Sequence, residues 1–141
     1  MIEALDEPTV PGIIVFDMEQ TITDGNDPPE VHVRPGIPEL IDAFRNLGFD
    51  VHVWTRARLA HAIDVLDSVG LRPRVDGIHE KPRWEESERI SGEDARRILG
   101  GVPVLQIDDW PEERIDGVPF LLLEPWAAEG EVVRWTGSEH E

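Results

Sequence analysis

The chain has 141 residues, 40% of them hydrophobic, and its 30 acidic and 13 basic residues give a formal net charge of −17. This length fits one globular domain, and no apolar run approaches the roughly 20 residues of a transmembrane helix, so we expect no membrane association. The negative charge repels polyanions, which argues against broad nucleic-acid binding.

The cysteine count and the N-terminus bear on the cellular compartment. The chain has no cysteine, so it has neither a disulfide framework nor thiolate chemistry. Residues 1–7 are mostly acidic or apolar and lack the basic and apolar regions of a signal peptide. We therefore expect a cytoplasmic protein. Its acidity fits a halophilic source, and an acidic mesophilic or phage protein at least as well.

The first predicted strand covers residues 12–16, after a loose lead-in over residues 1–11. Its residues 13–16 are all apolar, which is typical of a strand covered on both faces. Two acids, Asp17 and Glu19, follow this strand directly. Gly, Pro, Asp and Asn then dominate residues 23–30 and predict a loop, with residues 31–33 as one arm of a short flap.

Helices and strands alternate along the rest of the chain. Apolar residues at helical spacing, Pro in a first turn, Gly after the last turn and a near-capping box at Ser91 mark the helices. The predicted helices cover residues 38–47, 57–69 and 91–99, and the predicted strands cover residues 12–16, 50–54, 74–78, 102–107 and 120–123.

This alternation predicts an α/β fold, a three-layer Rossmann-like parallel sheet with helices on both faces. We assign the core to residues 12–123. Residues 124–141 are read as an acidic C-terminal extension with one short strand candidate at residues 132–135.

Reactive side chains follow four of the five predicted strands. The carboxyl ends of parallel strands meet at one edge of a sheet, so residues far apart in the sequence converge there. A carboxylate can attack phosphorus, carboxylates can hold a divalent cation, and a hydroxyl and an ammonium can bind phosphoryl oxygens. The set therefore favours phosphoryl transfer from an ester. In chain order it comprises Asp17 and Glu19, Thr55, Lys81, and Asp108 with Asp109.

The order of these residues resembles the four motifs of the haloacid dehalogenase-like (HAD) superfamily. The first family motif is a buried strand followed by Asp-x-Asp-x-Thr, and residues 17–21 read Asp-Met-Glu-Gln-Thr. Thr55, Lys81 and the pair at 108–109 match the second, third and fourth motifs. The Arg-Pro-Gly at residues 34–36 also looks like the C-terminal-domain phosphatase branch of that superfamily.

The resemblance implies a Mg2+-dependent phosphatase that works through an aspartyl-phosphate. Asp17 would be the nucleophile, and Glu19 would be the general acid and then the general base. Mg2+ would be bound by Asp17, by the backbone carbonyl of Glu19 and by Asp108 or Asp109.

The phosphoryl group would be held mainly by Thr55 and Lys81. Lys81 would also offset the repulsion between the carboxylates. Thr21, the last residue of the first motif, and Arg56, which follows Thr55, are further candidates for phosphate binding.

Simpler explanations exist for single residues. Thr55 suits the N-cap of the next helix, and the acids at 108–109 suit a turn. The only lysine of a chain with twelve arginines could fall at position 81 by chance. Several acids buried together without a cation would be costly, however, and arginine does not readily replace a compact ammonium in a crowded site. We therefore favour the functional interpretation for Lys81 and for the acids at 108–109. For Thr55 both interpretations stay open, since one threonine could fill both roles.

The spacing of the motifs leaves no room for a cap domain. The 38 positions from Asp17 to Thr55 are used by the flap, one helix and one strand, and only three positions separate Ile78 from Lys81. Members of the HAD superfamily that act on small metabolites usually carry a cap. We therefore expect an open site and a large substrate, such as a phosphoprotein or a nucleic-acid end, rather than a small metabolite.

Glu19 stands where the family motif has its second aspartate. The extra methylene displaces the carboxylate by about one bond length, and a misplacement of that order can cost about 10²-fold in rate. Two hypotheses follow. Either Glu19 still acts as acid and base in an active phosphatase, which we favour, or the chain is a catalytically weak or inactive HAD-like domain that serves as a binding or regulatory module.

Overall fold

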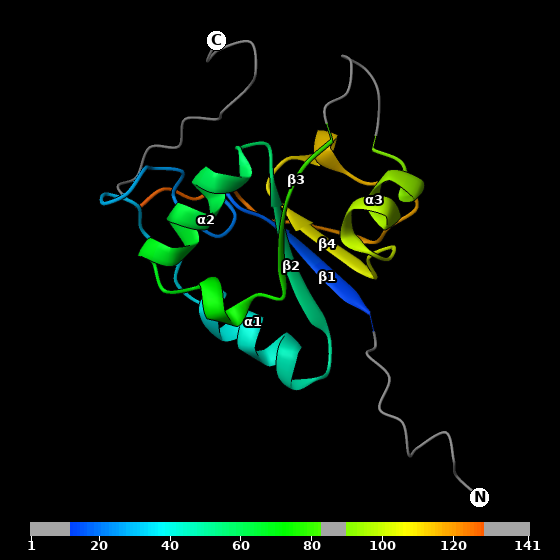
Figure 1. Ribbon diagram of the computed structural model, residues 1–141, viewed down its shortest axis with the longest axis horizontal. Helices are drawn as coiled ribbons and strands as arrows, with labels where there is room; N and C mark the ends of the chain where they lie inside the picture. Colours follow the sequence, from blue (N-terminus) through cyan, green and yellow to red (C-terminus); the bar gives the residue numbers. More distant parts are fainter. Residues whose placement is uncertain (1–11, 83–89, 129–141) are drawn as a thin grey trace, which may run out of the picture.

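The computed structural model of the chain describes residues 12–82 and 90–128. Within these residues, five parallel strands form one sheet in the order β3-β2-β1-β4-β5 (Figure 1). The strands are β1 (Ile13–Asp17), β2 (Asp50–Thr55), β3 (Gly77–Glu80), β4 (Leu105–Asp108) and β5 (Phe120–Leu122). The helices are α1 (Ile37–Asn46), α2 (Leu59–Ser68) and α3 (Gly92–Leu99), with 3-10 turns η2 (Arg72–Arg74) and η3 (Pro111–Glu113).

The sheet is the middle of three layers, which confirms the predicted α/β class. Figure 1 shows α1 and α2 on one side of the sheet and α3 on the other. The central strand β1 is covered on both faces, because Ile14 and Phe16 pack in the cluster under α1 and α2 while Val15 packs in the cluster under α3. This explains why its apolar residues do not alternate with polar ones. Trp54 of β2 is fully buried in the α3 cluster.

Helix α1 lies one residue earlier at each end than the predicted range of 38–47. Gly36 caps its start with a φ of 89°, a left-handed value that favours glycine, and Pro38 lies in the first turn. Ile37 and Ile41 are buried. Leu47, the last residue of the predicted helix, follows the end of α1 and is 68% exposed.

Helix α3 is capped as its near-capping box predicts. The Ser91 side chain accepts a hydrogen bond of 3.0 Å from the backbone N–H of Asp94. At the other end Gly100 adopts a φ of 88° and its N–H binds the carbonyl of Arg96. Ala95 and Leu99 then face the sheet.

Two strands differ from their predicted ranges by more than one residue. Residues 72–74 form the turn η2, so the third strand starts only at Gly77 and continues to Glu80, directly before Lys81. The fourth strand starts at Leu105 rather than at residue 102. Pro103 has no N–H to donate to a neighbouring strand, which shortens the usable run.

The segment between β1 and α1 folds back on itself as a short flap, residues 18–36. Thr23 and Val33 form an antiparallel bridge, and Arg34 N–H donates to the carbonyl of Ile22 over 2.7 Å. Residues 124–128 lie against it, since Trp126 N–H donates to the carbonyl of Gln20 over 3.0 Å. Between β1 and β2, residues 18–49 thus form this flap and α1.

Within residues 12–82 and 90–128, no helix has both the length and the apolar character of a membrane span. The predicted lead-in at residues 1–11 and the strand candidate at residues 132–135 lie outside the described residues.

Candidate active site

The carboxyl ends of four neighbouring strands bring the predicted site residues together. Asp17 ends β1, Thr55 ends β2, Lys81 follows β3 directly, and Asp108 ends β4. All four side chains are buried. Because the strands are parallel and adjacent, these positions share one edge of the sheet.

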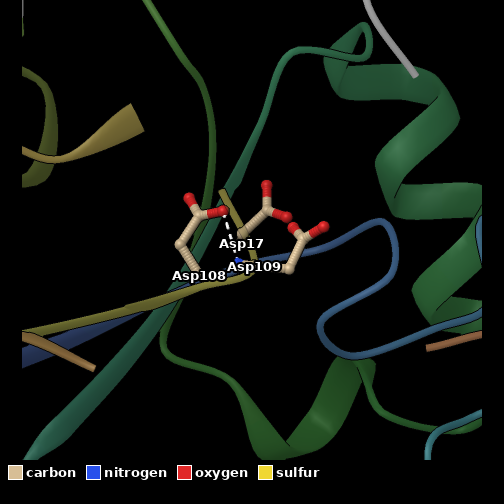
Figure 2. A group of neighbouring side chains, drawn as sticks. All are labelled: Asp17, Asp108 and Asp109. Atoms are coloured by element: carbon tan, nitrogen blue, oxygen red, sulfur yellow. Dashed lines mark hydrogen bonds between the residues drawn. The ribbon is translucent and has the colours of Figure 1, made fainter. Parts of the chain in front are cut away.

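Three aspartates form the centre of this edge. Asp17, Asp108 and Asp109 each present an oxygen atom within 4.8 Å of the others, and all three residues are buried (Figure 2). One oxygen of Asp108 accepts hydrogen bonds from the backbone N–H groups of Asp109 and Trp110, at 2.7 and 3.0 Å. Asp108 therefore does stabilise a turn, as the simpler explanation held, while its other oxygen faces the site.

Lys81 joins the acidic side chains electrostatically. Its ammonium lies 2.9 Å from an oxygen of Asp17, 3.3 Å from one of Asp108 and 2.9 Å from one of Glu113. The Lys81 side chain is only 2% exposed. Its ammonium also lies 5.9 Å from the centre of the Trp54 ring. The single lysine of the chain is thus held by three carboxylates at once.

Thr21 reaches the same carboxylates from the turn after β1. Gln20 adopts a φ of 63°, and the N–H groups of Ile22 and Thr23 both donate to the carbonyl of Met18. This tight turn carries Thr21 back toward the strand end. Its hydroxyl lies 3.2 Å from Asp17 and 3.2 Å from Asp109, and its single proton can serve one of them at a time.

Thr55 and Glu19 contact each other directly. The Thr55 hydroxyl donates to a carboxylate oxygen of Glu19 over 2.9 Å and accepts from the backbone N–H of Ala57 over 3.0 Å. The alternative that Thr55 is the N-cap of the next helix is wrong: Arg58 takes that position, and the N–H of Leu59 donates to Glu80.

Glu113 is a site residue that the sequence analysis missed. It lies at the end of η3, is 3% exposed and binds both Lys81 and the guanidinium of Arg56. Arg56, which we expected to contact phosphate, thus has its guanidinium on a buried carboxylate. No sequence signal separates Glu113 from its neighbour Glu112, which is exposed.

Burial and mutual repulsion raise the pKa values of Asp17 and Asp108. Burial raises the pKa of Asp17 well above its usual value, and the charge of Asp108 raises it further, although Lys81 opposes both effects. Burial raises the pKa of Asp108 to about 6, again against the influence of Lys81. The positive charge of Lys81 therefore does not fully offset the effect of burial and repulsion on the pKa of these two acids.

The pKa values of Lys81 and Glu113 shift in the directions that keep both groups charged. Burial by itself would lower the pKa of Lys81, but Asp17, Asp108 and Glu113 together raise it well above its usual value. Burial would likewise raise the pKa of Glu113, yet Lys81 and Arg56 lower it. Lys81 and Glu113 therefore form an ion pair at neutral pH.

The donor set of the three aspartates fits a hard divalent cation. Mg2+ and Ca2+ prefer carboxylate and carbonyl oxygens, and Mg2+ is commonly held by one or two carboxylates together with substrate oxygens. A cation at this position would also relieve the repulsion that raises the pKa of Asp17 and Asp108. The buried trio can therefore bind a metal ion.

Comparisons with known proteins support the fold. The chain is similar to an uncharacterized protein from Listeria monocytogenes serotype 4b, with a TM-score of 0.61 and 14% identity over 91% of this chain and 88% of that one. It is also similar to a chain in the structure of the Pnkp1/Rnl/Hen1 RNA repair complex, with a TM-score of 0.58 and 12% identity over 84% of this chain. The match spans 44% of that second chain. No protein-family model and no curated protein matches the sequence.

Proposed function

We propose that the protein is a Mg2+-dependent phosphatase of the HAD-like superfamily, which hydrolyses a phosphomonoester through an aspartyl-phosphate on Asp17. The observation that supports this most is the meeting of Asp17, Asp108 and Asp109 with Lys81 at the carboxyl edge of a parallel sheet. A nucleophile, a set of metal ligands and a phosphoryl-binding ammonium thus occupy one site, in the order of the family motifs.

Mg2+ would be held by Asp17, by Asp108 or Asp109, and by the backbone carbonyl of Glu19. When bound, it would neutralise negative charge on the carboxylates and on the phosphoryl group. Lys81 adds a positive charge that is fixed by burial. Such fixed charges are favourable for phosphoryl transfer, in which positioning and electrostatics supply most of the catalysis.

In the first step an oxygen of the Asp17 carboxylate attacks phosphorus, and the bond from phosphorus to the leaving oxygen breaks. Protonated Glu19 gives its proton to that oxygen, which departs as an alcohol. Thr55 and Lys81 bind the phosphoryl oxygens during the transfer. Glu19 must leave the Thr55 hydroxyl to do this, because the two are hydrogen-bonded at 2.9 Å.

In the second step a water molecule attacks the phosphoryl group on Asp17. The Glu19 carboxylate accepts a proton from this water as the new oxygen–phosphorus bond forms. The bond between Asp17 and phosphorus breaks, which releases inorganic phosphate and restores the Asp17 carboxylate. Thr21, hydrogen-bonded to Asp17, orients the nucleophile for the next cycle.

The substrate is proposed to be a phosphate on a large or exposed molecule. Residues 18–49 add only the flap and α1 to the sheet, and β3 ends directly before Lys81, so neither segment covers the site with a cap. A phosphoprotein and a nucleic-acid end both meet this requirement. The likeness to a chain of an RNA repair complex supports the nucleic-acid end, while the net charge of −17 restricts it to contacts near the terminus.

The Glu19–Thr55 contact also favours a second candidate function. A carboxylate on the hydroxyl that should bind phosphate would disfavour anion binding, as expected of a catalytically weak HAD-like domain that acts as a binding or regulatory module. Such a module would still bind a cation through its aspartates but would not hydrolyse a phosphate ester.

The test is steady-state hydrolysis of an aryl phosphate, with and without Mg2+, by the wild type and by Asp17→Asn. The phosphatase predicts Mg2+-dependent turnover that Asp17→Asn abolishes. Turnover indistinguishable from that of Asp17→Asn would instead identify the inactive module. A second series with a terminally phosphorylated RNA oligonucleotide and a phosphopeptide assigns the substrate class by the higher kcat/KM.

A further inference from the structure

A short segment after β5 lies against the turn that follows the proposed nucleophile. This segment, residues 124–128, is called the strap below, and residues 18–23 are called the nucleophile turn. The backbone N–H of Trp126 donates to the carbonyl of Gln20 over 3.0 Å. Figure 1 shows the strap, in orange, beside the blue flap that contains this turn. Two segments that are far apart in the sequence are thus in direct contact.

A second hydrogen bond fastens the strap to the flap. Nη1 of Arg34 donates to the carbonyl of Glu124 over 2.9 Å. Arg34 is itself held in the flap, since its backbone N–H donates to the carbonyl of Ile22 over 2.7 Å. A charged donor makes a stronger hydrogen bond than a neutral one. The strap is therefore fixed at two points, one on each side of Pro125.

The turn beneath the strap has a backbone conformation that needs support. Gln20 adopts a φ of 63°, in the left-handed region, where a residue with a Cβ atom is strained. Strain of this kind persists only where the surrounding structure holds it. The hydrogen bond from Trp126 to the carbonyl of Gln20 fixes the orientation of the peptide group that follows the strained residue.

The two neighbours of Gln20 both belong to the proposed active site. Glu19, on one side, is the proposed general acid and base. Thr21, on the other side, has its hydroxyl 3.2 Å from Asp17 and 3.2 Å from Asp109. A rotation of the backbone at Gln20 would therefore move both groups relative to the end of β1.

We infer that the strap is a positioning element of the active site, which keeps Glu19 and Thr21 in the geometry that turnover requires. Trp126 and Arg34 are then positioning residues, because they act through the nucleophile turn. This inference rests on the proposed phosphatase function and adds to it a segment that lies after the predicted core of residues 12–123.

The strap should affect turnover more than substrate binding. The groups proposed to bind the phosphoryl oxygens, Thr55 and Lys81, lie at the carboxyl ends of β2 and β3, which pair with each other in the sheet. Release of the strap would displace the proposed acid and base but leave these groups in place. A displacement of about 1 Å can cost about 10²-fold in rate. We therefore expect a lower kcat without a higher KM.

The first test compares Trp126→Pro with Trp126→Ala in the full chain. Both variants lose the indole, but only proline lacks the backbone N–H that binds the carbonyl of Gln20. With an aryl phosphate and Mg2+, Trp126→Pro should have a kcat lower by about 10-fold or more than Trp126→Ala. An equal or higher kcat in the proline variant, or an effect on KM alone, would overturn the inference.

The second test concerns Arg34. Arg34→Leu should lower kcat, and Arg34→Lys should restore most of it, because an ammonium still donates to the carbonyl of Glu124. The control is Arg74→Leu, which removes a surface arginine paired with Asp42 and should turn over as the wild type does. Equal activity of the two leucine variants, or no difference between lysine and leucine at position 34, would contradict the role of Arg34.

Amide hydrogen exchange separates this inference from the proposed function, since it needs no turnover. The N–H groups of Ile22 and Thr23 both donate to the carbonyl of Met18 and report on the nucleophile turn. They should exchange about 10-fold faster in Trp126→Pro than in Trp126→Ala, while the N–H of Gly100 at the end of α3 exchanges equally in both. This difference in a chain without turnover would refute the phosphatase and retain the strap as the support of the turn. Turnover without any such difference would refute the strap alone.

Discussion

The hydroxyl of Thr55 donates its proton to the carboxylate of Glu19 over 2.9 Å. Since Thr55 is fully buried and its oxygen already accepts from Ala57, this proton is what it can offer to a further acceptor. A phosphoryl oxygen at Thr55 must therefore displace the Glu19 carboxylate. Glu19 thus competes with substrate for a hydroxyl that the proposed mechanism needs.

Shortening Glu19 should relieve this competition. Glu19→Asp keeps a carboxyl group but withdraws it by one methylene, so we expect turnover of an aryl phosphate to rise by about 10-fold to 10²-fold. The measurement is kcat and kcat/KM at saturating Mg2+. Glu19→Ala is the control: it frees Thr55 without an acid or base, so inorganic phosphate should inhibit it more strongly than the wild type while kcat falls. Equal or slower turnover in Glu19→Asp would contradict this explanation.

Lys81 should be important for stability as well as for chemistry. Lys81→Met leaves Asp17, Asp108 and Glu113 without their shared buried cation, and breaking a buried ion pair in this way costs about 3–5 kcal/mol. Urea unfolding without metal measures the loss. The control is Arg56→Gln, whose side chain is 54% exposed and which should cost about 0–1 kcal/mol. Equal losses in the two variants would show that Lys81 does not hold the carboxylates together.

Glu113 and Glu112 offer a matched pair of adjacent acids. Glu113→Gln weakens contacts with Lys81 and Arg56 at a buried position and should lower the free energy of unfolding by about 1–3 kcal/mol. Glu112→Gln changes an exposed side chain and should stay within about 0.5 kcal/mol. Parallel urea titrations make the comparison. A loss as large at position 112 would show that the contacts of Glu113 with Lys81 and Arg56 do not stabilise the fold.

Mg2+ should stabilise the protein in a pH-dependent manner. The pKa of Asp108 is raised to about 6 by burial, so this group stabilises the fold at low pH and loses that contribution as pH rises through about 6. Asp17 shifts in the same direction. Mg2+ binds the ionised carboxylates, so its effect on Tm should be larger at about pH 8 than at about pH 5.

Differential scanning calorimetry with and without Mg2+ at both pH values checks this expectation. Asp109→Asn should reduce the Mg2+ effect, whereas Asp64→Asn, an exposed acid on α2, should retain it. A Tm rise that is the same at both pH values would argue against cation binding by the buried aspartates.

The sequence predicts the sheet well because its signals are local. The apolar run before Asp17 marks the buried central strand, and Ser91 and Gly100 mark the two ends of α3. Once the strands are parallel and adjacent, the residues after them must meet at one edge, so the convergence of Asp17, Lys81 and Asp108 follows from the chain order.

Features that depend on packing between distant segments could not be predicted in this way. In the sequence Glu113 resembles any acid of a surface turn, and only the fold of η3 brings it into contact with Lys81. The hydrogen bond between Nδ1 of His52 and Nε2 of His79 depends on the register between β2 and β3, and our expected third strand began several residues too early. The Glu19–Thr55 contact likewise depends on how the turn after β1 folds back.

The central claim is that Asp17 carries the phosphoryl group during turnover. The most direct measurement is mass spectrometry of peptides from protein quenched with acid during reaction with an aryl phosphate and Mg2+. We predict one phosphoryl group on the peptide that contains Asp17, dependent on Mg2+ and absent in Asp17→Asn. Phosphate release without a phosphorylated Asp17, or turnover by Asp17→Asn equal to that of the wild type, would contradict the account.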